Sequence, residues 1–135
     1  MNTKLVVLSS QSILLPLIVS YNYNDNLGIM LLSMLYLTSV IFWNNPIQGL
    51  VRCLDITLVQ LVLWIGLYRS QYCNITYLYM IYVTLNMIAM VSFTRGLVIY
   101  HKNKSLYIIY HMLLHIFGSA SAVSNTICYF HNRLS

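Results

Sequence analysis

Long apolar stretches separated by short polar interruptions make up most of the chain. Each stretch approaches the roughly 20 residues that an α-helix needs to cross a hydrocarbon core of about 30 Å. The pattern predicts one helical domain over residues 1–135, with no internal repeat. The five predicted spans are Leu5–Ser20, Leu27–Trp43, Leu54–Tyr68, Ile75–Phe93 and Ser105–Val123.

The predicted spans differ in regularity. The first contains Pro16 and a polar cluster at Ser9–Ser12, so a four-span bundle without it is the alternative. The second ends before Pro46, because proline disfavours a helical residue in front of it. The fourth begins with closely spaced tyrosines, which are typical of a membrane interface, and an extension of this helix to Tyr100 stays open.

The stretches are uniformly apolar rather than alternating, which favours helices over the strands of a membrane barrel. An open sheet in lipid would also leave its edge groups unpaired. We therefore predict an all-α, polytopic transmembrane helix bundle. The composition agrees, with 59% hydrophobic and only 7% charged residues, where soluble domains average about 25% charged.

The charged residues bear on partners and topology. The seven Lys and Arg residues are scattered, so we expect membrane lipid and no nucleic acid as a partner. Five spans place the two termini on opposite sides of the membrane, and the side with more basic residues is usually cytosolic. The N-terminus is therefore predicted to be cytosolic. That side would carry Lys4, Arg52, Arg95, Lys102 and Lys104, against Arg69 and Arg133 on the other.

His111 and His115 are the first candidates for chemistry. Their spacing places both imidazoles on one helix face, about one turn apart, where one metal ion can bridge them. Gly118 and Ala122 continue this face with the small residues of a close helix contact. The alternative is a pair of neutral histidines that form hydrogen bonds with neighbouring helices. In either case the pair is predicted to face other helices rather than lipid.

Asp55 and Ser39 are the second pair of candidates. Asp55 falls in the first turn of its predicted helix, near Arg52, where an acid stabilises the helix dipole. The Ser39 hydroxyl is expected to form a hydrogen bond with a backbone carbonyl of its own helix. The alternative is that Ser39 and Asp55 are both catalytic. Gln60 and Asn86 are interpreted as hydrogen-bond partners between helices. In the predicted topology Ser39, Asp55 and the two histidines converge on one leaflet.

These residues resemble a motif set of the alkaline ceramidase and progestin/adipoQ receptor superfamily of transmembrane hydrolases. Ser39-Val-Ile-Phe-Trp43 matches its Ser-x-x-x-His motif in spacing, with Trp43 at the histidine position. Asp55 stands where the family has an Asp early in the next helix. His111-Met-Leu-Leu-His115 matches its final His-x-x-x-His motif.

The resemblance implies a zinc-dependent hydrolase of a lipid amide or ester. Family members have seven helices and hold zinc with three histidines, with the Asp and Ser beside the metal-bound water. Carried over to this chain, His111 and His115 would be metal ligands. Asp55 would be the general base, and Ser39 would support the metal-bound water or the oxyanion. The chain departs from the family in one missing histidine and two missing helices.

The predicted topology assigns each of the three cysteines to one side of the membrane, which can be tested. Cys73 and Cys128 fall on the same, outer side of a five-span chain, and Cys53 falls on the cytosolic side. Unpaired, partly buried thiols are the favoured interpretation. A Cys73–Cys128 disulfide is the alternative if their Cα atoms approach within about 7 Å.

For function, the leading hypothesis is a structural or assembly component of a membrane, without enzymatic activity or cofactor. A chain of this length has little material for a ligand cavity, so we expect self-association or a partner membrane protein. The zinc-dependent hydrolase is the alternative. A proton or ion conductor that uses His111 and His115 as a relay is the third hypothesis.

Overall fold

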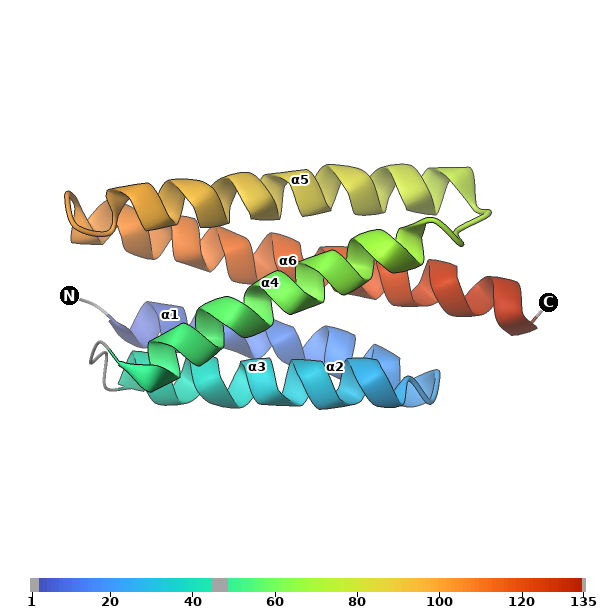
Figure 1. Ribbon diagram of the computed structural model, residues 1–135, viewed down its shortest axis with the longest axis horizontal. Coiled ribbons are helices and arrows are strands. Elements are labelled where there is room, and N and C mark those ends of the chain that lie inside the picture. Colours follow the sequence, from blue (N-terminus) through green and yellow to red (C-terminus); the bar gives the residue numbers. More distant parts are fainter. Residues whose placement is uncertain (1–2, 45–48, 135) are drawn as a thin grey trace.

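The structure is a computed structural model that describes residues 3–44 and 49–134, and it is helical with no strand among them (Figure 1). Five helical segments have the length and apolar composition to cross a membrane, which confirms the predicted all-α bundle. The helices are α1 (Thr3–Ser10), the 3-10 turn η1 (Gln11–Ile13), α2 (Leu14–Asn22), α3 (Asn26–Asn44), α4 (Leu50–Ser70), α5 (Thr76–Ile99) and α6 (Lys104–Leu134).

The first span is one helical segment with a local change of pitch. α1, η1 and α2 follow one another without a loop, and the segment Lys4–Asn22 is long and apolar enough to span. Pro16 has no N–H to donate to the carbonyl of Ser12, and this carbonyl lies in the 3-10 turn, which ends at Ile13, three positions before the proline. The first segment therefore meets the requirements of a spanning helix, which favours five spans over the four-span alternative.

Several helices are longer than predicted. α4 begins at Leu50 rather than Leu54, α5 extends to Ile99, and α6 continues past Val123 to Leu134. The sequence pattern excluded the polar residues at these ends from the helices. A helix that leaves the hydrocarbon core keeps its internal hydrogen bonds, so polar side chains at its ends are tolerated there.

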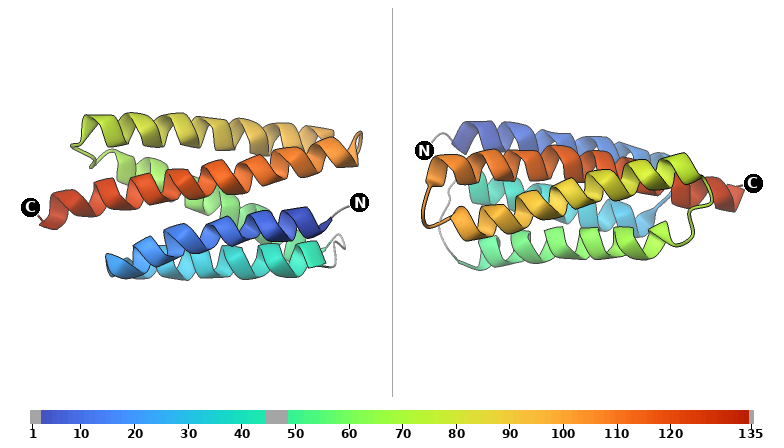
Figure 2. Two further views of the ribbon diagram at one scale, coloured as in Figure 1. Left: turned by 180° about the vertical axis from the view of Figure 1, so that it is seen from behind. Right: turned by 90° about the horizontal axis from the view of Figure 1, so that it is seen from above.

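The packing places α6 at the centre of the bundle. α5 packs antiparallel along α6, and α6 also contacts α1, α2 and α4 (Figure 2). The N-terminus and the α5–α6 connection lie at one end of the bundle, here called the N-terminal end (Figure 1). The C-terminus lies at the other, C-terminal end, with the α2–α3 turn and the α4–α5 loop.

The distribution of side chains is reversed relative to a soluble protein. Large apolar side chains are exposed around the outside, among them Leu8, Leu15, Ile18, Met30, Trp64 and Val91. Many polar side chains are buried, including those of Ser39, Asp55, Asn86 and both central histidines of α6. This arrangement suits a hydrocarbon surrounding, in which polar groups find partners only inside the bundle.

α4 and α5 diverge from each other. They approach at the C-terminal end, where an added Cβ on Gly66 would lie 3.0 Å from the Tyr82 hydroxyl, and they separate towards the N-terminal end (Figure 1). The space between them forms a groove of about 260 Å³, called here the α4–α5 groove. It is lined by Gln60, Leu63, Trp64, Leu67, Met90, Phe93 and Thr94.

Candidate functional site

The carboxylate of Asp55 lies inside the bundle, in the half nearer the N-terminal end. Its Oδ1 accepts hydrogen bonds from Ser39 Oγ at 2.5 Å and from Thr38 Oγ1 at 3.3 Å, both on α3. Asp55 is only 2% exposed. The predicted capping role is wrong, because α4 begins at Leu50 and no acidic residue falls in its first turn. Asp55 instead joins α4 to α3.

Ser39 also differs from its expected arrangement. It is fully buried and donates to Asp55, whereas we expected a bond to a carbonyl of its own helix. The neighbouring Thr38 makes that local bond, to the Leu35 carbonyl at 3.1 Å. The two hydroxyls therefore satisfy a carboxylate that would otherwise be buried without hydrogen bonds.

His111 and His115 face the interior, as predicted, and are 9% and 4% exposed. His111 Nε2 accepts a hydrogen bond from Trp43 Nε1 at 3.1 Å. The two imidazole centroids lie 4.6 Å apart, and His115 Nε2 is buried without a partner. On the same turn of α6, Ser12 Oγ donates to the His115 carbonyl at 3.0 Å and thereby connects α6 to η1.

The predicted convergence is confirmed for Ser39, Asp55 and His111. Asp55 and His111 line one small cavity of about 10 Å³, together with Arg52 and Tyr107, and Ser39 is bonded to Asp55. Three helices thus contribute polar groups to one place in the N-terminal half. His115, one turn further along α6, lines a separate neighbouring cavity.

The donor set does not fit a zinc ion. Across residues 3–44 and 49–134, no group of three His, Cys, Asp or Glu side chains could hold a metal ion. Trp43 occupies the histidine position of the resembling Ser-x-x-x-His motif, and its indole N–H donates to His111 Nε2, so this nitrogen is not available to a metal. The metal site predicted at His111 and His115 therefore has no support among the described residues.

A second polar cluster at the C-terminal end was missed at the sequence level. Asp25, in the α2–α3 turn, forms a bidentate ion pair with Arg69 of α4, with N···O distances of 2.5 and 2.7 Å. Their side chains are only 3% and 10% exposed. Asp25 Oδ1 also accepts the Gly28 N–H at 3.0 Å, as a residue before a helix does. The predicted five-span topology places Asp25 and Arg69 at the same end of the bundle. This shared end is the feature of the sequence that could have indicated an ion pair between them.

A cavity of about 40 Å³ adjoins this ion pair. Ser20 and Tyr82 line it, and both hydroxyls are buried without a hydrogen-bond partner. Asn125 Nδ2 donates to the Gly66 carbonyl at 2.9 Å and joins α6 to α4 beside the cavity. A Cβ at Gly28 would collide with the Asp25 carboxylate, so glycine is required for this close approach.

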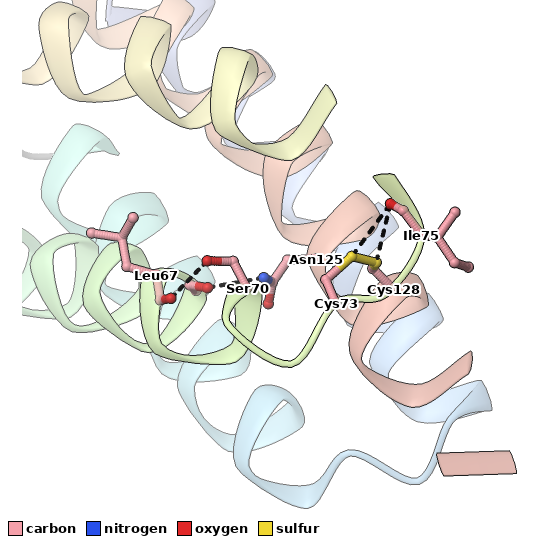
Figure 3. The surroundings of a disulfide bond; sticks show 7 residues. Leu67, Ser70, Cys73, Ile75, Asn125 and Cys128 are labelled. Carbon is pink, nitrogen blue, oxygen red and sulfur yellow. Dashed lines mark hydrogen bonds between the residues drawn. A yellow bond between two sulfur atoms is a disulfide. The ribbon is translucent and has the colours of Figure 1, made fainter. Parts of the chain in front are cut away.

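A disulfide between Cys73 and Cys128 fastens the α4–α5 loop to α6 at the C-terminal end (Figure 3). Their Cα atoms are 5.3 Å apart. The favoured interpretation of three unpaired thiols is therefore wrong for these two residues, and the disulfide alternative is correct. Cys53 is exposed and carries a free thiol.

Gln60 and Asn86 were both expected to bond across helices. Asn86 is buried and lines the cavity beside the ion pair, but its recorded contact is with Met90 Sδ of its own helix, at 3.9 Å. Gln60 is the eleventh of the 21 residues of α4 and is exposed in the α4–α5 groove. Within the described part of the chain, no side chain of another helix forms a recorded hydrogen bond with Gln60.

Over residues 3–44 and 49–134, the fold and the two polar clusters define a bundle of five apolar helical segments with the features of a multi-pass membrane protein. No family model, curated protein or solved structure matches it.

Proposed function

We propose that this protein is an assembly component of a membrane: a small multi-pass chain that associates with a second copy of itself through the α4–α5 groove. The observation that carries the proposal is Gln60, an amide exposed halfway along a spanning helix. An amide that faces hydrocarbon loses its hydrogen bonds with water and gains none from lipid. A partner that covers Gln60 would remove this cost.

A second copy is the occupant that best suits this surface. A glutamine amide carries both donors and an acceptor, so two glutamines related by a two-fold axis can bond reciprocally. Copies of one membrane protein share an orientation, so Gln60 of each lies at the same depth. Trp64, one turn away and 65% exposed, supplies a large apolar surface beside the amide.

The interior of the bundle also supports an assembly role over a lipid-processing one. The cavities that contain Asp55, His115 and Asp25 have volumes of only about 10 to 40 Å³. Ligand pockets for small organic molecules are usually about 300–1,000 Å³. The α4–α5 groove, at about 260 Å³, lies on the outer surface where another helix can reach it.

The proposed orientation keeps the N-terminal end in the cytosol. Five basic residues lie towards that end, including Arg52 and Arg95. The C-terminal end carries only Arg69 and Arg133. This excess of five basic residues over two supports the orientation under the positive-inside rule, which counts Lys and Arg rather than net charge.

Self-association can be tested by energy transfer between donor- and acceptor-labelled copies in phosphatidylcholine vesicles. Wild type should transfer energy in a manner that depends on the protein-to-lipid ratio. Gln60→Leu should weaken association roughly threefold to thirtyfold, since an interhelical hydrogen bond in lipid contributes about 0.6–2 kcal/mol. Gln60→Asn should retain most of the association, because it keeps the amide.

Gln11→Leu is the matched control, since it makes the same substitution outside the groove. Gln11 is exposed and accepts a hydrogen bond from Tyr36, so its loss should leave energy transfer unchanged. Wild-type copies that transfer no energy at any protein-to-lipid ratio would overturn the proposal. Equal transfer by wild type and Gln60→Leu would place the contact elsewhere and refute the role of this groove.

A further inference from the structure

Three small cavities follow one another along the inner face of α6. The first, of about 10 Å³, contains Asp55 and His111, and the second, of about 40 Å³, contains His115. The third, also about 40 Å³, adjoins the Asp25–Arg69 ion pair. Neighbouring cavities share walls: Val59 and Leu114 line both the first and the second, and Leu32, Val62, Leu63, Gly118 and Ala122 line both the second and the third.

Each cavity contains a buried polar atom that lacks a hydrogen-bond partner. Arg52 Nε is at the first cavity, His115 Nε2 at the second, and the hydroxyls of Ser20 and Tyr82 at the third. Within the described part of the chain, these four are the buried side-chain nitrogen and oxygen atoms without a partner. All four therefore lie along a single line of cavities instead of being spread through the bundle.

Water is the ligand that fits these spaces. An unsatisfied buried polar group costs about 1–3 kcal/mol, and a bridging water removes that cost. A buried water needs roughly 10–15 Å³ of such volume and two or more polar neighbours. The two larger cavities, at about 40 Å³ each, exceed this volume, and the smallest is close to it.

We propose that water molecules fill these cavities as a file between Asp55 and the Asp25–Arg69 pair, and that this file conducts protons across the bundle. Each water or hydroxyl in the file accepts a proton from one neighbour and passes a different proton to the next. For every O–H bond formed one is broken, and one proton leaves at the far end for each that enters. No electron transfer or other reactant is required.

The same geometry favours protons over other ions. A cavity of 10 to 40 Å³ holds single water molecules and leaves no room for an ion with its hydration shell. The cationic groups at the file are Arg52 at one end and Arg69, paired with Asp25, at the other. The other titratable side chains that line it are Asp55, Tyr82, Tyr107, His111 and His115.

Gly118 offers a direct way to interrupt the file. It lines the second and third cavities, and a Cβ added there meets no atom within 4 Å. Gly118→Leu therefore places a side chain at the junction without a collision at its Cβ. Tyr82→Phe is the second variant, because the hydroxyl it removes has no protein partner to leave unsatisfied. Ile116→Val, on the exposed side of the same helix, is the control.

The experiment uses the full-length protein in phosphatidylcholine vesicles with a trapped pH dye and a potassium gradient made permeable by valinomycin. Wild type and Ile116→Val should acidify the vesicles faster than protein-free controls. Gly118→Leu should reduce the flux to the protein-free level, and Tyr82→Phe should reduce it in part, with far-ultraviolet circular dichroism confirming the fold of each.

A wild-type rate equal to that of empty vesicles would overturn the proposal. So would unchanged flux in a folded Gly118→Leu variant or, if that variant does not fold, in Tyr82→Phe. Gln60→Leu should conduct normally, which separates this test from the test of self-association.

Discussion

The buried Asp25–Arg69 pair gives the sharpest test of what holds the C-terminal end together. Two substitutions separate its contributions. Asp25→Asn keeps the side-chain oxygen that accepts the Gly28 N–H but removes the negative charge. Arg69→Met keeps an unbranched side chain, shorter than that of arginine, and removes the positive charge. Each variant alone leaves the opposite charge buried without its counterion.

The expected magnitudes follow from this geometry. Both N···O contacts are short, at 2.5 and 2.7 Å, and neither side chain is more than 10% exposed. Removal of one partner of such a pair typically costs about 3–5 kcal/mol, because an uncompensated charge remains. The double variant leaves no charge, so it should be more stable than either single variant. The coupling between the two sites should therefore be near the upper end of the usual range of about 0.5–3 kcal/mol.

The assay is reversible unfolding in mixed detergent micelles, followed by circular dichroism, for wild type, both single variants and the double variant. Asp55→Asn, in the other cluster, serves as a reference that should not couple to Arg69→Met. If each single variant lost less than about 1 kcal/mol, the pair would behave as a solvent-exposed ion pair. Simple additivity of the two substitutions would also refute the reasoning, since it would mean that the charges do not compensate each other.

Three further predictions concern other contacts. Replacement of Cys73 and Cys128 by serine should lower the free energy of unfolding by about 4 kcal/mol in the same micelle assay, because the bond closes a loop of 55 residues in the unfolded chain. An unchanged free energy of unfolding would show that the bond does not constrain the unfolded chain. Trp43→Phe should cost about 1–3 kcal/mol in thermal unfolding, because it leaves the buried His111 Nε2 without its donor, and a cost near zero would argue against this hydrogen bond. A membrane-impermeant maleimide added outside intact cells should label Cys53 only after the membrane is permeabilised; labelling before that step would invert the proposed orientation.

The sequence was sufficient for the fold class and for one of the two clusters. The periodicity of apolar stretches defines spanning helices because the bilayer imposes a minimum length. Once the helix order is known, Ser39, Asp55 and His111 must lie at similar depths. A helix that starts at Leu54, as the apolar pattern predicts, has Asp55 in its first turn. The helix instead begins at Leu50, which puts this acid in the second turn and explains why the predicted capping role is wrong.

The second cluster depended on contacts that periodicity does not encode. Asp25 lies in a turn, and Arg69 lies near the end of a helix, where charged residues usually face water or lipid head groups. Whether two such charges meet depends on how α3 and α4 pack laterally. The disulfide between Cys73 and Cys128 depends in the same way on the position of the α4–α5 loop over α6. Helix order restricts these pairs to one end but leaves their lateral positions open.

The disulfide also bears on the order of events during biosynthesis. Cys73 precedes α5 and Cys128 lies near the end of α6, so both helices must be in place before the two sulfurs can meet. Disulfides form in oxidising compartments, so both residues must also be on the same side of the membrane. A chain inserted with the wrong topology would keep Cys73 and Cys128 as thiols, and a chain that ends before Cys128 could not form the bond. The disulfide therefore forms only in chains whose insertion is complete. The fraction of oxidised protein at successive times after pulse labelling would measure how quickly the chain acquires its final topology.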